Sequence, residues 1–122
     1  MTHKIHVSVK TSYMADQTLP KQRYVYSYTI TITNEGDETA QLISRHWLIR
    51  DAKDHLQEVQ GIGVIGEQPH ITPGSSYTYT SGVVLETETG MMEGTYQMRA
   101  ENGETFEAEI PTFALVPPHA IH

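Results

Sequence analysis

The sequence contains no cysteine, few basic residues and no long apolar run, and each absence removes a class of protein. Without cysteine there is no disulfide framework, no thiolate zinc site and no thiol nucleophile. No apolar stretch approaches the roughly 18 residues that a membrane-spanning helix needs. The first residues alternate in polarity instead of forming the apolar block of a signal peptide. Together these features predict a cytoplasmic protein that does not enter a membrane.

The charge is one-sided. There are 8 Lys and Arg against 15 Asp and Glu, a net charge of -7 with His neutral. Nucleic-acid affinity rests mainly on cationic side chains that meet phosphates, and this chain has no Lys/Arg cluster. We therefore expect no binding to DNA, RNA or an anionic membrane surface. The acids gather near residues 35–38, 86–88 and 101–109, and we interpret them as solvated turns and strand faces. The alternative is a patch that meets a basic partner or a divalent cation.

The residues that are present are typical of one folded domain. Hydrophobic residues make up 38% of the chain, and there are 7 Tyr, 1 Trp and 2 Phe. A disordered acidic chain would have few aromatic residues. The length of 122 residues matches the roughly 100–150 residues of a typical domain. We predict a single domain over residues 1–122.

Period-two alternation dominates the chain, which is the pattern of half-buried strands. The clearest case is one face formed by Tyr24, Tyr26, Tyr28, Ile30 and Ile32. Similar alternation covers residues 5–9, 77–85, 96–100 and 106–110, with turn residues every 8–12 positions. No window shows helical periodicity. The pattern predicts an all-β, immunoglobulin-like antiparallel sandwich of about seven to eight strands.

Three positions sharpen this prediction. Trp47 falls in the third predicted strand, where immunoglobulin-like domains often bury a tryptophan. Tyr96 lies near the start of the next-to-last predicted strand, where a tyrosine corner would donate to an upstream backbone group. After Pro111 the alternation slips by one step, which predicts a bulge or kink there.

A glycine motif, G-x-G-x-x-G, is formed by Gly61, Gly63 and Gly66. In dinucleotide-binding domains such glycines lie between a strand and a helix whose N-terminus holds a pyrophosphate. Here Pro69 and Pro73 follow so closely that the required helix is not expected. We interpret the glycines as positions of positive φ or of close packing at a sheet edge. The alternative is a nest of backbone amides at Gly61, Gly63 and Gly66 that binds phosphate or pyrophosphate.

Histidines and carboxylates show no arrangement typical of a metal or catalytic site. The histidines are His3, His6, His46, His55, His70, His119 and His122, and none has helical zinc-ligand spacing. We interpret them as surface residues, with His46 facing away from Trp47. Glu107 and Glu109 are expected on the solvated face of a strand. The residues therefore predict no catalytic group, no metal ligand and no cofactor.

The chain resembles a known family. The resemblance rests on residues 23–32, 45–49, 58–69, 73–82, 90–96, 106, 110–111 and 120–122, which are similar in order and identity to the bacterial ApaG family, also called CorD. It implies a fibronectin-type-III-like sandwich in a cytoplasmic bacterial protein, and a genetic link to cobalt resistance and magnesium efflux. Similar domains in eukaryotic F-box proteins and in a DNA-polymerase-interacting protein imply a role in protein–protein interaction. The family's glycine motif has also invited a nucleotide-binding proposal, and no established catalytic residues can be carried over.

We therefore expect a non-enzymatic binding module that presents a sheet edge or the loop 61–75 to an unidentified protein partner. One alternative is a protein that binds cobalt or magnesium directly through its acids and histidines. A less favoured alternative uses the glycine loop to bind pyrophosphate or a nucleotide, or to act on a phosphoester. The sequence does not identify the partner. It also leaves the oligomeric state open, and a homodimer is one of the possible states.

Overall fold

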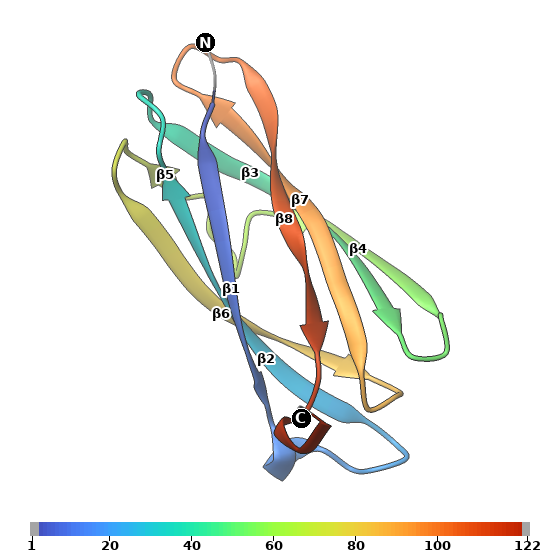
Figure 1. Ribbon diagram of the computed structural model, residues 1–122. Coiled ribbons are helices and arrows are strands. Elements are labelled where there is room, and N and C mark those ends of the chain that lie inside the picture. Colours follow the sequence, from blue (N-terminus) through green and yellow to red (C-terminus); the bar gives the residue numbers. More distant parts are fainter. Residues whose placement is uncertain (1–2, 121–122) are drawn as a thin grey trace.

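The computed structural model describes residues 3–120, and they form two antiparallel sheets packed face to face (Figure 1). One sheet has the order β1 (Ile5–Tyr13), β2 (Tyr24–Asn34), β6 (Ser76–Leu85). The other has the order β4 (Leu56–Ile62), β3 (Ala40–Asp51), β7 (Gly90–Ala100), β8 (Thr105–Leu115), and the two-residue β5 (His70–Ile71) pairs with the start of β3. The prediction of an all-β, immunoglobulin-like (fibronectin-type-III-like) sandwich is confirmed.

The connections between strands are short. A 3-10 turn, Ala15–Gln17, follows β1, and a second one, Pro118–Ala120, follows β8. Gly103, in the turn between β7 and β8, has a φ of 88°, which a glycine adopts without strain. Across residues 3–120 no helix has the length and apolar character needed to cross a membrane.

Strand β2 shows why the alternation specifies this fold. Its residues Tyr26, Ile30 and Ile32 are fully buried between the sheets. The threonines on its other face pair with hydroxyl side chains of β6. These pairs are Thr29 with Thr80 at 2.8 Å, Thr31 with Thr78 at 3.0 Å and Thr33 with Ser76 at 2.7 Å. The apolar face thus builds the core, while the hydroxyl ladder fixes the register of β2 against β6.

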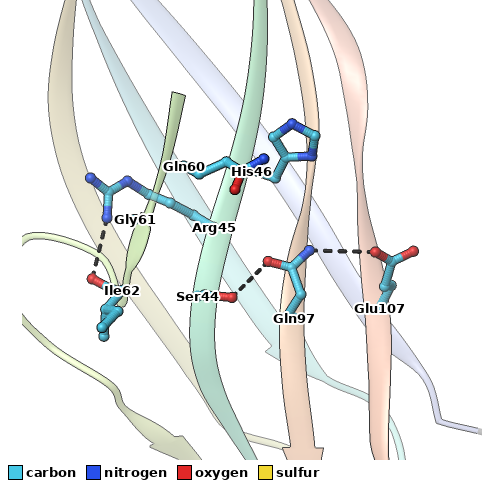
Figure 2. A pocket seen from close by; sticks show the side chains of 8 residues that line it. All are labelled: Ser44, Arg45, His46, Gln60, Gly61, Ile62, Gln97 and Glu107. Atoms are coloured by element: carbon cyan, nitrogen blue, oxygen red, sulfur yellow. Dashed lines mark hydrogen bonds between the residues drawn. The ribbon is translucent and has the colours of Figure 1, made fainter. Parts of the chain in front are cut away.

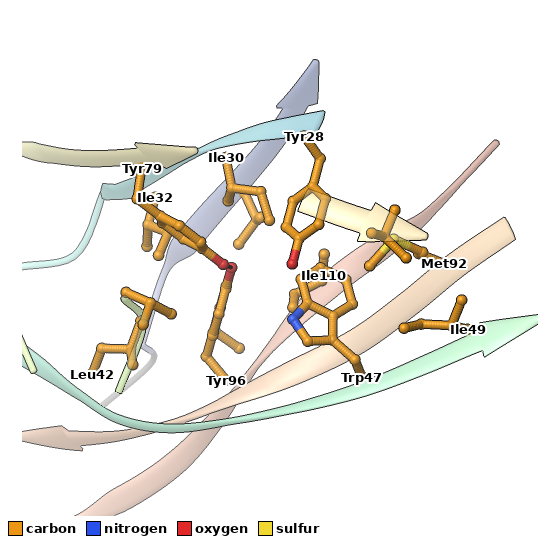
Figure 3. Packing of buried hydrophobic residues seen from close by; sticks show 14 of the residues in the cluster. Tyr28, Ile30, Ile32, Leu42, Trp47, Ile49, Tyr79, Met92, Tyr96 and Ile110 are labelled. Carbon is orange, nitrogen blue, oxygen red and sulfur yellow. Dashed lines mark hydrogen bonds between the residues drawn. The ribbon is translucent and has the colours of Figure 1, made fainter. Parts of the chain in front are cut away.

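Trp47 of β3 lies at the centre of the core, as its position in the third strand predicted (Figure 3). Its ring meets Tyr28 of the opposite sheet in a T-shaped contact with centroids 5.5 Å apart. On β8, Phe113 makes a second T-shaped contact with Trp47 at 5.9 Å. Edge-to-face geometry of this kind adds to the stability that burial alone provides.

The predicted tyrosine corner is wrong. Strand β7 already begins at Gly90, so Tyr96 lies in the middle of the strand and points inward. Its hydroxyl shares a hydrogen bond of 2.5 Å with the hydroxyl of Tyr79 on the opposite sheet, not with an upstream backbone group (Figure 3). Burial raises the pKa of both phenols well above their ordinary value, so both stay neutral.

The irregularity predicted at Pro111 is confirmed. Gly94 of β7 pairs with Ile110 of β8, whereas Met92 pairs with Phe113. Two steps along β7 therefore match three steps along β8, which is a β-bulge. The bulge explains why the apolar alternation of β8 changes phase after Pro111.

Histidine exposure follows the predictions with one exception. His46 faces away from Trp47 and contacts Glu58 on the outer surface of its sheet, as expected. His3 is not a free surface side chain. It stacks on Phe106 with ring centroids 4.0 Å apart, and only 14% of its side chain is exposed. His122 lies outside the described residues.

The two long sides of the sandwich differ. On one side β1 lies beside β8, so the edges of the two sheets come together (Figure 1). On the other side the edge strands are β4 and β6, and a cleft lies between them. We call this second side the open side. It matters for function because this cleft and a cluster of Asp51, His55 and Glu86 both lie along it.

Candidate functional site

The segment 61–67, called the glycine loop below, leads from the end of β4 toward β5 and is tightly held. The amide of Gly63 donates to the carbonyl of Ile43 at 2.8 Å. Val64 and Glu67 exchange two backbone hydrogen bonds of 2.9 and 2.8 Å, and the side chain of Val64 is completely buried. Backbone bonds and a buried anchor thus fix the shape of a loop that lies at the surface.

Each glycine of the motif has a structural reason. A Cβ on Gly61 would lie 2.7 Å from Nη1 of Arg45. Gly63 has a φ of 65°, and a Cβ there would collide with the carbonyl oxygen of Glu67. Gly66 has a φ of 80° with open space around it. The interpretation as positions of positive φ and close packing is confirmed, and the chain continues from Gly66 to β5 without a helix.

Phosphate binding by Gly61, Gly63 and Gly66 stays a prediction. The amides of Gly63 and Val64 already donate to backbone carbonyls, which leaves them unavailable to an anion in this conformation. Shifts of the amide resonances of residues 61–66 on titration with pyrophosphate would test it directly.

The most exposed large apolar side chains belong to this loop. Ile62 is 76% exposed and Ile65 is 59% exposed. Ile65 also has a φ of 42°, a conformation in which a β-branched side chain is strained. Sequence reasoning concentrated on the glycines and missed these two residues. The available signal was the presence of isoleucines between the glycines of the motif, in a short turn where polar residues are more usual.

Beside the loop, a shallow depression of about 530 Å³ lies on the sheet of β3, β4, β7 and β8 (Figure 2). It is lined by Ser44, Arg45, His46, Gln60, Gly61, Ile62, Gln97 and Glu107. Ser44 donates to Oε1 of Gln97 at 2.8 Å, and Nε2 of Gln97 lies 3.5 Å from Oε2 of Glu107. Glu107 is exposed, as predicted for the solvated face of its strand.

The polar groups of this depression are arranged for hydrogen bonding. Ser44 and His46 both face outward, but Ser44 is bonded to Gln97 and His46 to Glu58. Activation of a serine needs a base that accepts its proton, and the hydroxyl of Ser44 donates to the amide oxygen of Gln97 instead of to His46. The depression therefore offers donors and acceptors around the exposed Ile62.

A separate cluster lies near the ends of the strands. Oδ1 of Asp51 accepts from the amides of Lys53 at 2.8 Å and His55 at 3.0 Å, while Oδ2 lies 3.4 Å from Nδ1 of His55. Burial alone would raise the pKa of Asp51, but the amides of His55 and Lys53 and the His55 side chain hold that pKa below its ordinary value. Glu86 completes a group whose ligand atoms lie within 4.8 Å of one another.

This cluster was not predicted from the sequence, because its members come from different sheets. Asp51 and His55 belong to the hairpin between β3 and β4, whereas Glu86 follows β6. A hydrogen bond of 2.9 Å from the amide of Ala52 to Oγ1 of Thr87 joins the two turns. The sequence interpretation of Glu86 was a solvated turn, with a patch for a basic partner or a divalent cation as the alternative. Nothing in the spacing shows that the two turns meet.

Comparison with known proteins decides the family. The model of the ApaG domain matches residues 15–100. The chain belongs to the ApaG domain family. The protein ApaG of Thiobacillus denitrificans is 54% identical over 98% of this chain and 95% of its own length. The protein ApaG of Ectopseudomonas mendocina is 52% identical over 98% of this chain and 96% of its own length.

Solved structures share the fold of this chain. The crystal structure of an ApaA protein from Bordetella pertussis matches with a TM-score of 0.92 and 47% identity, covering 95% of both chains. A protein from Archaeoglobus fulgidus matches with a TM-score of 0.57 but only 8% identity, covering 94% of this chain and 97% of its own. The first comparison shows that the fold is shared with a protein of 47% identical sequence, and the second shows a shared fold alone.

Proposed function

We propose that this ApaG-domain protein is a non-enzymatic binding module that contacts another protein through the glycine loop and the adjoining depression. The observation that carries the proposal is Ile65, an exposed β-branched residue with positive φ. Such a conformation costs on the order of 1–3 kcal/mol, and an exposed side chain recovers little of this by packing. A strained and exposed apolar residue on a rigid loop is better explained by binding than by stability.

The surroundings of Ile65 have the composition of a protein interface. Ile62 and Ile65 supply apolar area, and the depression beside them supplies exposed polar groups at Gln60 and Glu107. Protein interfaces commonly combine an apolar centre with a polar rim. Because the hydrogen bonds of Gly63 and Val64 fix the loop, binding would require little ordering of the backbone. The proposal includes a cytoplasmic location, which rests on the sequence features given above.

Site-specific photo-crosslinking tests the contact surface. A photoreactive amino acid at Ile62 should give a discrete protein adduct in cells of the native host. The same amino acid at Leu19, a 46% exposed apolar residue in the turn between β1 and β2, is the matched control. The same pattern of adducts at both positions, or no adduct at Ile62, would show that the loop is not the contact surface.

A second candidate function, direct binding of a divalent cation, is favoured by the cluster of Asp51, His55 and Glu86. One imidazole and two carboxylates suit a first-row transition ion such as Co²⁺ better than Mg²⁺, which prefers oxygen ligands only. This function would agree with the link to cobalt that the family resemblance implies.

Calorimetry with Co²⁺ and Mg²⁺ separates this candidate from protein binding alone. Heat with Co²⁺ that disappears in His55→Ala but persists in His70→Ala, an exposed histidine of β5, supports the metal site. No heat with either ion and no change in melting temperature would exclude it.

A further inference from the structure

A cleft of about 310 Å³ lies on the open side of the sandwich, between the two sheets. Tyr28 and Trp47 line its floor from opposite sheets, with only the edges of their buried rings exposed (Figure 3). Val59 of β4 and Val84 of β6 line it from the two edge strands. Its volume and its mixed lining of apolar side chains with Arg45, Gln57 and Ser81 suit a small amphipathic ligand.

The charge of this cleft is opposite to that of the protein. Arg45 is its one charged lining residue, although the chain carries a net charge of -7. Within residues 3–120 no carboxylate oxygen lies within 4.0 Å of the Arg45 guanidinium. A partly buried cation without an acidic partner favours an anionic ligand.

The orientation of Arg45 is also fixed. Its Nη1 donates to the carbonyl oxygens of Gly63 at 2.8 Å and Ile62 at 3.3 Å. Its guanidinium packs against the backbone of Gly61, where no side chain interferes. In the described part of the chain, Nε and Nη2 have no acceptor. These two nitrogens form the edge of a guanidinium that binds a carboxylate through two parallel hydrogen bonds.

A second donor among the lining residues lacks an acceptor. The side chain of Trp47 is 2% exposed, and its indole Nε1 has no hydrogen-bond partner among the described residues. Because this nitrogen is itself buried, it does not reach the cleft, and the free edge of Arg45 is the donor that favours a ligand with oxygen acceptors.

We propose that this cleft binds a small apolar carboxylate. Its hydrocarbon or aromatic part would lie against Val59 and Val84, beside the buried rings of Trp47 and Tyr28. Its carboxylate would pair with Nε and Nη2 of Arg45. The acids of the open side fix the direction of the ligand. Asp51 and Glu86 line a neighbouring pocket that shares Val84 with the cleft, so the carboxylate points toward Arg45 and away from them.

Fluorescence of Trp47 measures occupancy, because Trp47 is the single tryptophan of the chain and lines the cleft. The probes are 3-phenylpropionate and its neutral counterpart 3-phenylpropanol. We expect the carboxylate to bind at least about tenfold more tightly than the alcohol, a difference of about 1.4 kcal/mol. Amide resonances of Ser81 and Val84 should shift during the same titration.

Two arginine variants identify the recognising group. Arg45→Gln should bind acid and alcohol equally, whereas Arg23→Gln, which removes an exposed arginine elsewhere, should keep the tenfold preference. The comparison of the two ligands on the unmodified protein stands even if Arg45→Gln folds poorly. Equal affinity for acid and alcohol, amide shifts only outside the cleft, or no fluorescence change up to about 20 mM acid would overturn the proposal.

Discussion

The guanidinium of Arg45 occupies the space in which a side chain at Gly61 would project. A Cβ on Gly61 would lie 2.7 Å from Nη1 and 2.8 Å from Cζ of Arg45. The first glycine of the motif therefore has a definite role, which is to let an arginine of β3 reach across to β4. From there Arg45 binds the carbonyl oxygens of the glycine loop and faces the cleft of the open side.

Gly61→Ala should therefore change binding more than stability. The new methyl group displaces only the end of a flexible side chain, so the free energy of unfolding should change by less than about 1 kcal/mol. The displaced guanidinium should lose its bond to Gly63, and with it the preference for 3-phenylpropionate over 3-phenylpropanol. Urea denaturation and the Trp47 titration measure the two effects, and a large loss of stability with intact ligand preference would contradict this view of Arg45.

Substitution of the other two glycines of the motif, Gly63 and Gly66, should lower the free energy of unfolding to different extents. Gly63→Ala brings a methyl group into the backbone of Glu67 at positive φ, so we expect a loss of at least about 2 kcal/mol. Gly66→Ala creates no steric contact, because nothing lies near that position. It only forces alanine into a positive φ, which should lower the free energy of unfolding by about 1 kcal/mol. Urea denaturation of both variants gives the comparison, and equal losses would show that the contact with Glu67 carries no weight.

Asn34 holds three backbone groups together from a buried position. Its Nδ2 donates to the carbonyls of Glu38 at 2.7 Å and Ile71 at 2.8 Å, and its Oδ1 accepts from the amide of Gly36 at 2.9 Å. Asn34→Ala leaves these groups without partners and should lower the free energy of unfolding by about 2–4 kcal/mol. Gln22→Ala, at an exposed position, is the control and should be close to neutral in the same denaturation experiment.

Buried tyrosines make the protein sensitive to alkali. Burial, assisted by the charges of Tyr13 and Glu88, raises the pKa of Tyr26 to about 12 from its ordinary value of 10.0. The unfolded chain thus ionises first, and stability that is complete below about pH 10 should be lost progressively up to about pH 12. Urea midpoints across this range measure the loss. Tyr26→Phe should show a shallower decline, and an unchanged slope would mean that Tyr26 does not contribute.

Much of the fold could be predicted from the sequence because strand formation and burial follow local alternation. The tyrosines and isoleucines of β2 and the phase slip at Pro111 are readable from period two alone. Contacts between sheets are not readable in this way. The Tyr79–Tyr96 pair and the meeting of Asp51 with Glu86 depend on how two layers are placed against each other, which residue spacing does not encode.

The candidate site was only partly predictable for a related reason. A glycine motif suggests a site made of backbone amides. Here the amides of Gly63 and Val64 instead donate to backbone carbonyls that hold the loop in place. The groups that distinguish the loop are the side chains between and beside the glycines. The exposure of Ile65 and the reach of Arg45 become visible only when the conformation of the loop is known.

Ile65→Gly gives the most direct test of the proposed binding surface, because stability and binding should move in opposite directions. Glycine relieves the strain of positive φ, so the variant should be as stable as the unmodified protein or more stable. Leu19→Ser, which removes an exposed apolar residue elsewhere, is the control. The decisive measurement is the affinity of Ile65→Gly for the partner crosslinked at Ile62. A loss of about tenfold or more, with Leu19→Ser unchanged, is expected, and an unaltered affinity would contradict the account.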